Sequence, residues 1–259
     1  MATAKRKIIF VGGAPRSGTT AVHGLLCTAK NANNYAAETS FLTGIVSAYA
    51  LGLNNWDVHT REHFASKDEY RKLMGRMLNT AITHLHRFHK AGEWLVVKDP
   101  LLTSNFPLAA ELLPDQARFV TVVRNPLDIL RSRQEVSRKG GHEMEIPHVR
   151  RISKQAMRDY AHLSDERMAG CLFSFRYEDL QDGKTITDLT AFTGLKGIDP
   201  DALWSGRKED SSLLDDTNWQ SPKYGKPLDT TPRLNPLQPD FARVVRRICA
   251  PLMSEHGYE

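Results

Sequence analysis

The chain has 259 residues, of which 41% are hydrophobic and 25% charged, and it carries a net charge of +5. This composition is that of a globular protein and excludes an intrinsically disordered chain. The positive excess suits an anionic ligand but is too diffuse to indicate nucleic acid. Three cysteines lie far apart, which argues against a disulfide framework or a zinc site and fits a reducing compartment.

No apolar run approaches the length of about 20 residues that is needed to span a bilayer. The beginning of the sequence, MATAKRKIIFVGG, places an apolar run behind a basic patch, as a signal peptide would. That run is too short and leads directly into a pair of glycines, so we do not expect a signal peptide. The expectation is a cytoplasmic protein that does not enter a membrane.

The first predicted element is a buried strand over Lys7–Val11, followed by a glycine-containing loop and a helix from Thr19 onward. Such a loop can surround phosphate oxygens with backbone N–H groups. Gly13 and Gly18 have the spacing of the nucleotide-binding pattern G-x-x-x-x-G-K-[ST], but Thr19 stands where the lysine belongs. Thr20 keeps the hydroxyl, and the cation lies upstream at Arg16. We therefore expect the loop to bind a phosphate-like group other than the β/γ-phosphates of a nucleoside triphosphate.

Three more apolar runs predict strands, over Trp94–Val97, Phe119–Val123 and Leu172–Phe175. Helices are predicted over Asp68–His89, from Asn125-Pro126 to just before Gly140, and over Phe241–Glu255. The segment Gly206–Gln238 has little periodicity and is rich in proline and glycine, as binding loops and disordered segments are. The alternation of strands and helices predicts an α/β fold of the P-loop type, in which a doubly wound, mostly parallel sheet is flanked by helices. One domain over residues 1–259 is expected.

Polar residues follow the predicted strands where each strand ends. Lys98-Asp99 follow the second strand, Arg124 follows the third and opens the helix that carries Ser132, and Tyr177 comes after the fourth. In open α/β sheets ligands bind outside the carboxyl ends of the strands. Each of these residues could merely end a strand, but together with the glycine loop they predict one shared crevice.

The motifs PRSGTT, KDP, VVRNPLDILRS and RYEDL, in this order, resemble the sulfotransferases that use PAPS, the adenylyl phosphosulfate with an added 3′-phosphate. The stretch IIFVGGAPRSGTT followed by AETS is most similar to tyrosylprotein sulfotransferases. The resemblance extends from Lys7 to about Leu228. It implies the sulfotransferase fold, PAPS as co-substrate, PAP as product and no metal.

The resemblance also implies site residues. The 5′-phosphate would be bound by Arg16, Ser17, Gly18, Thr19 and Thr20, and the 3′-phosphate by Arg124 and Ser132. Further cofactor contacts would come from Tyr177 and, in the irregular segment, from Ser221 and Lys226. The family's next basic contact has no match at Val136, and Arg133 or Arg138 could replace it.

Glu38 matches the catalytic base of the tyrosylprotein enzymes, although the stretch between the glycine loop and Glu38 is one residue longer than expected. Alternatively, Glu38 only complements the dipole of a following helix. Lys98 and Arg16 would stabilise charge on the leaving oxygen, and Asp99 either orients Lys98 or caps a turn. A histidine could be the base instead, and the candidates are His23, His59, His63 and His142. The spacing of His84, His86 and His89 favours a solvated surface over a metal site.

We therefore expect a sulfotransferase that moves a sulfuryl group from PAPS to a hydroxyl acceptor: a peptide tyrosine, a carbohydrate or a small-molecule alcohol. The alternatives are a P-loop small-molecule kinase and a non-catalytic binder of PAP or anionic glycans. The stretch from Val136 to Arg151 is either a lid or acceptor-recognition loop or a plain surface loop. Expected partners are the acceptor and, as an option, a second copy of the chain, but neither nucleic acid nor a membrane.

Overall fold

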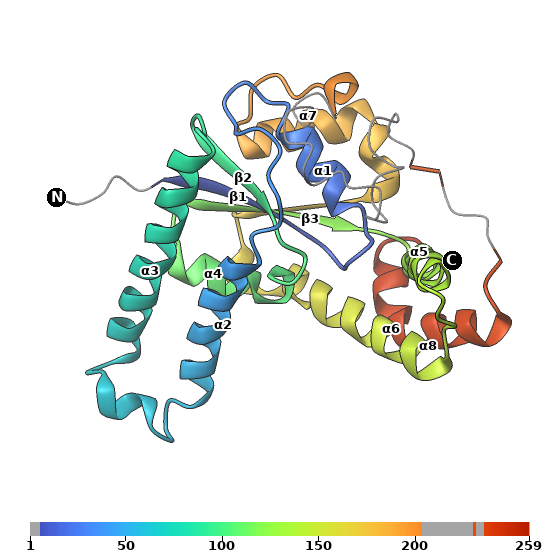
Figure 1. Cartoon of the computed structure of the whole chain (residues 1–259), viewed down its shortest axis with the longest axis horizontal. Helices are drawn as coiled ribbons and strands as arrows, with labels where there is room; N and C mark the ends of the chain where they lie inside the picture. Colours follow the sequence, from blue (N-terminus) through green and yellow to red (C-terminus); the bar gives the residue numbers. More distant parts are fainter. Residues whose placement is uncertain (1–5, 204–229, 232–235, 259) are drawn as a thin grey trace.

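The computed structural model describes residues 6–203, 230–231 and 236–258 of the chain. Four parallel strands form a central sheet in the order β2-β1-β3-β4 (Figure 1). They are β1 (Lys7–Gly12), β2 (Trp94–Lys98), β3 (Ala117–Val123) and β4 (Leu172–Arg176). All four predicted strands are confirmed, with bounds that differ by one or two residues. Ile9 pairs with Val96 on one side and with Arg118 on the other, so β1 lies in the middle of the sheet.

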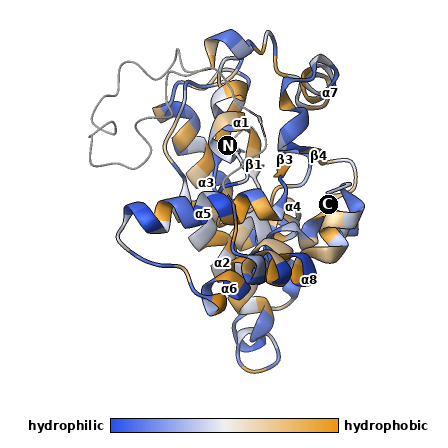
Figure 2. Cartoon of the chain, turned by 90° about the vertical axis from the view of Figure 1, so that its right-hand side faces the viewer, coloured by the Kyte–Doolittle hydropathy of each residue, from blue (hydrophilic) through white to orange (hydrophobic). Residues whose placement is uncertain are grey.

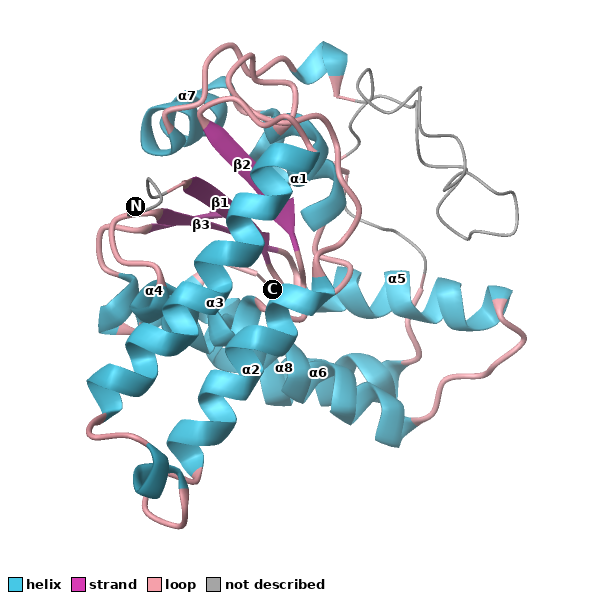
Figure 3. Ribbon diagram, turned by 60° about the vertical axis from the view of Figure 1, so that its left-hand side comes forward, coloured by secondary structure: helices cyan, strands magenta, loops and turns pink. Residues whose placement is uncertain are grey.

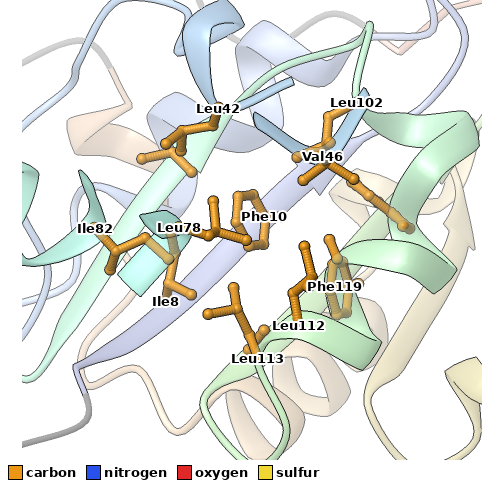
Figure 4. Packing of buried hydrophobic residues seen from close by; sticks show 14 of the residues in the cluster. Ile8, Phe10, Leu42, Val46, Leu78, Ile82, Leu102, Leu112, Leu113 and Phe119 are labelled. Carbon is orange, nitrogen blue, oxygen red and sulfur yellow. The ribbon is translucent and has the colours of Figure 1, made fainter. Parts of the chain in front are cut away.

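Both faces of the sheet are covered, because successive side chains of the strands point to opposite sides. Ile8 and Phe10 belong to the core cluster on one face, which α2 (Ser40–Asn54), α3 (Lys67–Phe88) and α4 (Phe106–Leu112) complete (Figure 4). Ile9 and Val11 belong to the cluster on the other face, under α1 (Thr19–Leu26) and α7 (Gly183–Thr193). The predicted α/β fold with a parallel sheet flanked by helices is confirmed.

Three further helices pack together beside the sheet: α5 (Pro126–Lys139), α6 (Ile146–Tyr160) and α8 (Pro239–Glu255). Leu130 of α5, Val149 of α6 and Val245 of α8 share one apolar cluster. Figure 2 shows hydrophilic and hydrophobic residues interspersed along α6 and α8. The remaining short helices are 3-10 turns: Thr60–His63, Thr103–Asn105, Ala161–Ser164, Glu166–Met168, Tyr177–Gln181 and Pro200–Ala202.

The predicted helix starts and ends are close to those observed. Asn125 caps α5 by accepting the N–H of Leu127 at 3.0 Å, and Pro126 is the first helical residue. Ser66 caps α3 in the same way, through the N–H of Glu69 at 3.1 Å. Within the described part of the chain, no helix is long and apolar enough to cross a membrane.

Two sequence expectations need correction. His86 is not solvated: it is buried, and its Nε2 lies 2.8 Å from the backbone oxygen of Lys7, which ties α3 to the start of β1. The stretch 136–151 is mostly helical, because α5 continues to Lys139 and α6 begins at Ile146. Only residues 140–145 connect the two helices, so a long loop does not exist there. The irregular segment 206–238 lies largely outside the described residues.

Candidate active site

The carboxyl ends of the four strands lie at one edge of the sheet, because all four run in parallel. The loop between β1 and α1, Lys98 at the end of β2, Arg124 after β3 and Tyr177 after β4 therefore meet there. Figure 3 shows β1, β2 and β3 side by side in this sheet. The hydrogen bonds and packing contacts described below connect each of these segments to at least one of the others. The crevice expected from the strand ends is thus assembled from the predicted segments.

The glycines of the loop are required by their backbone and by their neighbours. Gly18 has φ +104°, and a Cβ placed on it would lie 2.2 Å from a ring carbon of Tyr177. A Cβ on Gly12 would lie 2.3 Å from the ring of Phe106. Arg16 also has a positive φ of 82°, although it is not glycine. Such backbone conformations cost free energy in non-glycine residues and gather at functional sites.

The loop is anchored by a residue that sequence reasoning missed. Thr103, which is fully buried in the turn after β2, accepts the N–H of Gly13 at its Oγ1 at 2.9 Å. The N–H of Ser17 donates to the backbone oxygen of Ala14 at 2.9 Å and closes the loop on itself. The only signal for Thr103 in the sequence was its position shortly after the KDP motif.

Arg16, Arg124 and Ser132 are brought together, although more than a hundred residues separate Arg16 from the other two. The Nε of Arg16 donates to the Oγ of Ser132 at 3.0 Å, and the Nη1 of Arg124 donates to the backbone oxygen of Arg16 at 3.4 Å. The Arg124 guanidinium also lies over the ring of Tyr177, 4.5 Å from its centroid. Two arginines and a hydroxyl thus converge on one place, which suits an anion with several oxygens.

A buried donor in this region, the Nε of Arg124, has no hydrogen-bond partner among the described residues. Arg124 is only 7% exposed, and the nearby Ser17 is completely buried. A buried donor without an acceptor costs free energy, and such groups call for an explanation. A bound phosphate would supply the missing acceptor oxygens. The residues present therefore fit a phosphate group.

Glu38, Lys98 and Thr20 form a second cluster next to the loop. The Nζ of Lys98 lies 2.8 Å from the Oε1 of Glu38 and donates to the Oγ1 of Thr20 at 2.8 Å. The Lys98 side chain is 4% exposed, whereas that of Glu38 is 48% exposed. A buried ammonium needs a counter-charge, which Glu38 supplies. Glu38 is thus held by Lys98 and still open to solvent on its other side.

Asp99 caps a turn and fastens α2. One carboxylate oxygen accepts the N–H of Leu101 at 3.0 Å, and the other accepts the hydroxyl of Thr43 in the first turn of α2. Burial raises the pKa of Asp99 and the nearby charge of Glu38 adds to this rise, while the hydrogen bonds oppose it. Of the two roles considered from the sequence, the observed contacts are those of the cap. Asp99 thus ties the turn after β2 to the helix that follows Glu38.

The reserve histidines are not brought to Glu38. His23 is completely buried, with its Nε2 3.2 Å from the backbone oxygen of Val96 and its ring against Tyr35. His59 and His63 lie at the turn between α2 and α3, and His142 follows α5. A buried ring facing a strand carbonyl is poorly placed to take a proton from an acceptor in solution.

A buried polar network behind the loop was not expected. Burial raises the pKa of Asp159 to about 7, against the opposing effect of Arg158 and Arg133. Burial lowers the pKa of His162 to about 4. The Nδ1 of His162 lies 2.8 Å from the backbone oxygen of Asp159, and its Nε2 lies 2.7 Å from the Oγ1 of Thr121 on β3. Of the two arginines considered as a further basic contact, Arg133 is partly buried near Asp159, whereas Arg138 is exposed near the end of α5.

A sequence profile of the sulfotransferase family matches residues 9–200, which include the loop, Glu38, Lys98, Arg124, Ser132 and Tyr177. The chain belongs to the sulfotransferase family. It is therefore a sulfotransferase by family and fold. The more specific likeness to tyrosylprotein sulfotransferases is not confirmed. A comparison with curated protein sequences found no match.

Solved sulfotransferase structures share the fold over nearly the whole chain. The sulfotransferase domain of the Synechococcus PCC 7002 olefin synthase matches with a TM-score of 0.56 and 18% identity, covering 96% of this chain and 98% of its own. The sulfotransferase domain from the curacin biosynthetic pathway matches with 0.53 and 16%, covering 98% of each chain. Sulfotransferase STF9 from Mycobacterium avium matches with 0.55 and 14%, covering 100% of this chain and 78% of its own. At these identities the likeness shows the fold alone.

Ser221 and Lys226, which the sequence suggested as contacts from a cofactor-covering loop, lie outside the described residues. The roles of the other site residues stay predictions.

Proposed function

We propose that this sulfotransferase uses PAPS and transfers its sulfuryl group to an acceptor hydroxyl, releasing PAP. The observation that carries the proposal is the pairing of Glu38 with Lys98 beside a loop near which the buried Nε of Arg124 has no hydrogen-bond partner. The carboxylate beside a buried ammonium suits proton transfer and the stabilisation of charge, and the buried donor near the loop suits a bound phosphate.

Bound PAPS would supply an activated sulfuryl group on its 5′-phosphate. The loop from Arg16 to Thr20 would hold that phosphate with backbone N–H groups and the hydroxyls of Ser17, Thr19 and Thr20. Arg124 and Ser132 would hold the 3′-phosphate. The Arg124 guanidinium would be oriented for this by its stacking on the ring of Tyr177. Ser221 and Lys226 are retained as further candidate contacts.

In the proposed reaction the acceptor oxygen forms a bond to sulfur while the bond from sulfur to the phosphate oxygen breaks. Glu38 takes the proton of the acceptor hydroxyl at a carboxylate oxygen. Lys98, held by Glu38 and Thr20, and Arg16 place positive charge where the leaving oxygen becomes more negative. Because Lys98 contacts both Glu38 and the loop, it links the proton acceptor to the leaving-group side. The chemistry needs no metal.

Two rival functions make different demands on the same residues. A P-loop kinase would need a lysine at position 19, where this chain has Thr19, to neutralise the β/γ-phosphates. A non-catalytic binder of PAP or anionic glycans would not need a carboxylate beside a buried lysine. We infer a cytoplasmic enzyme, since Cys27, Cys171 and Cys249 are all free thiols.

The deciding experiment compares ligands by thermal melting. PAP should raise the melting temperature more than ATP or GTP with Mg²⁺, because a ligand that binds only the folded state stabilises it by mass action. Labelled PAPS with a library of hydroxyl acceptors should then yield a sulfated product. If ATP with Mg²⁺ stabilises more than PAP, the chain is a kinase-like protein and the proposal fails. Binding of PAP without any turnover would instead indicate the non-catalytic binder.

Arg124→Ala tests the assignment of the 3′-phosphate. It should weaken PAP binding by about 2 kcal/mol, because a charge-assisted contact is lost. An analogue without the 3′-phosphate serves as the matched ligand, since any general damage to the site affects both ligands equally. Calorimetric titration of both ligands gives the difference. Equal losses would show that Arg124 acts only through its packing on Tyr177.

A further inference from the structure

The surroundings of Glu38 bear on the acceptor, whose hydroxyl must reach the exposed side of that carboxylate. Three residues beyond Glu38, the side chain of Phe41 is 53% exposed; three residues beyond Lys98, that of Leu101 is 57% exposed. Leu101 stays near α2 because its N–H and the hydroxyl of Thr43 share the carboxylate of Asp99. A large, exposed apolar side chain thus follows each of the two charged residues, Glu38 and Lys98, at a distance of three residues along the chain.

The helix α2, which begins two residues after Glu38, also exposes apolar side chains. The fifteen residues of α2, SFLTGIVSAYALGLN, include no charged side chain. Leu42, Val46 and Tyr49 face the core, whereas Phe41, Ala48 and Leu51 lie on the exposed side, with Leu51 64% exposed. Phe41 and Leu51 are ten residues apart, or about 15 Å along a helix. Exposed helix faces are normally charged, and adjoining exposed apolar side chains mark binding surfaces.

We propose that this surface, defined by Phe41, Ala48, Leu51 and Leu101, binds the apolar body of the acceptor, which makes the acceptor a hydrophobic alcohol or phenol. The proposal rests on the proposed function, because it takes Glu38 as the group that meets the acceptor hydroxyl. Continuity with that site favours the acceptor over other occupants. The absence of charge on α2 disfavours a carbohydrate acid or a strongly acidic peptide, which would find no counter-charge there.

The test uses a series of 4-alkylphenols from phenol to 4-hexylphenol, whose hydroxyl group stays nearly constant while the apolar body grows. We expect kcat/KM to rise about two- to four-fold for each added methylene, as burial of one methylene predicts. Methyl glucoside and N-acetyltyrosinamide should be poorer acceptors than the longer phenols. Titration of the protein with 4-hexylphenol, with and without PAP, gives a binding constant that does not depend on turnover.

Phe41→Ser and Leu101→Ser should flatten the dependence of kcat/KM and of binding on chain length. Both side chains are exposed, so the variants should fold, and circular dichroism checks this. Phe88→Ser is the matched control: Phe88 is 71% exposed at the end of α3, outside the proposed surface. It should keep the chain-length dependence of the wild-type protein.

The outcomes separate the two proposals. Turnover with no dependence on chain length, or a preference for the sugar or the tyrosine derivative, overturns the apolar acceptor and leaves sulfotransfer standing. Binding that grows with chain length and needs Phe41, without any sulfation, supports the surface and overturns the proposed function. A change of molecular mass in Phe41→Ser by light scattering, with the chain-length dependence intact, shows that the surface joins two copies of the chain and overturns its assignment to the acceptor.

Discussion

The carboxylate of Glu38 neutralises Lys98 and is at the same time open to solvent, from which an acceptor could approach. If it is the general base, Glu38→Gln removes the proton acceptor and keeps the shape. The rate of sulfation should then fall by about 10²–10⁴-fold, the range typical of general bases. PAP affinity should change little, because the base faces the acceptor. Single-turnover sulfation and PAP titration on the same variant measure both quantities.

The matched control is Glu93→Gln, which also removes a carboxylate paired with a lysine: Glu93 Oε1 lies 2.8 Å from Lys7 Nζ in an exposed ion pair. This variant should sulfate at the wild-type rate. A Glu38→Gln enzyme with near-normal single-turnover chemistry would refute the base assignment. Glu38 would then only balance the charge of Lys98 and the dipole of α2.

Asp159 and His162 should oppose each other in the pH dependence of stability. Folding raises the pKa of Asp159 from an ordinary value near 4 to about 7, so this residue stabilises the folded state at low pH and loses that contribution as the pH rises toward 7. Folding lowers the pKa of His162 from about 6.5 to about 4, so its contribution is present above pH 6.5 and is lost as the pH falls toward 4. Between about pH 4 and pH 6.5 the two effects cancel in the wild-type protein.

Single variants should expose each half of this balance. Asp159→Asn should make the free energy of unfolding fall on acidification more steeply than in the wild type, by up to about 1.4 kcal/mol for each pH unit. His162→Gln should change the slope in the opposite direction. Urea unfolding at pH 4.5, 5.5 and 6.5 measures the slopes, and the other carboxyl groups contribute equally to all three proteins. Slopes unchanged by both substitutions would mean that neither group has a shifted pKa.

The positions of residues were predictable where a motif fixes the spacing and hard to predict where orientation decides. Arg16 and Arg124 follow strands and Lys98 ends one, and parallel strands bring their carboxyl ends together whatever the intervening sequence is. Whether His23 and His86 point into the core or to solvent depends on how α1 and α3 are rotated against the sheet. The identity of a single residue does not indicate that rotation. Both rings turned out to be buried against backbone oxygens. Thr103 could not be identified as the anchor of Gly13, because many hydroxyl residues follow strands.

At the scale of elements, the junction between the loop and α1 depends on Gly18. Gly18→Ala forces a side chain into a positive φ and against the ring of Tyr177, which lies 2.2 Å from the ideal Cβ position. The positive φ alone should cost about 1–2 kcal/mol. The clash adds to this cost and should also weaken PAP binding, because the loop must shift. Chemical denaturation and PAP titration measure the two effects.

Gly170→Ala provides the comparison. Gly170 also has a positive φ, +75°, but a Cβ there has no neighbour within 4 Å. Its variant should lose only the backbone contribution and bind PAP normally. If both variants lose the same stability, the ring of Tyr177 yields easily and the close packing on Gly18 is unimportant.

The sheet was predictable because its strands are short apolar runs ended by polar residues, as buried parallel strands are. α3 and α5 were predictable because they combine a clear apolar stripe with capping residues. The strand order β2-β1-β3-β4 could not be obtained in this way, since it depends on the crossovers between strands. The full extent of α2 was equally hidden: without charged residues on its outer face, it lacks the alternation that marks an amphipathic helix.

At the scale of the whole molecule, positive charge is concentrated on one side. Together α5, α6 and α8 contain eleven Lys and Arg but only five Asp and Glu, although the entire chain has a net charge of only +5. Four cations of α6, Arg150, Arg151, Lys154 and Arg158, line a surface groove of about 340 Å³ with Pro147. Clustered like charges raise the local potential more than dispersed ones.

A column with sulfonate groups should therefore retain the protein through α6. Replacing Arg150 and Lys154 by Gln should lower the salt concentration at elution more than replacing Arg76 and Arg87, which are exposed on α3. The two double variants have the same net charge, so a difference reports on clustering alone. Equal shifts would mean that only net charge determines retention.

The reason why Gly12 and Gly18 are glycines affects how active members of this family can be recognised from their sequences. A side chain at position 12 would clash with Phe106, and one at position 18 would clash with Tyr177. Both glycines are therefore required by packing within the protein, whether or not a nucleotide is bound. A descendant that lost its enzymatic activity would still need them in order to fold. Glu38, whose side chain is half exposed, would be free to change once Lys98, the buried cation that it balances, was also replaced. Within this family, a search by the glycine signature would then count inactive descendants as enzymes, whereas the state of the glutamate would tell them apart.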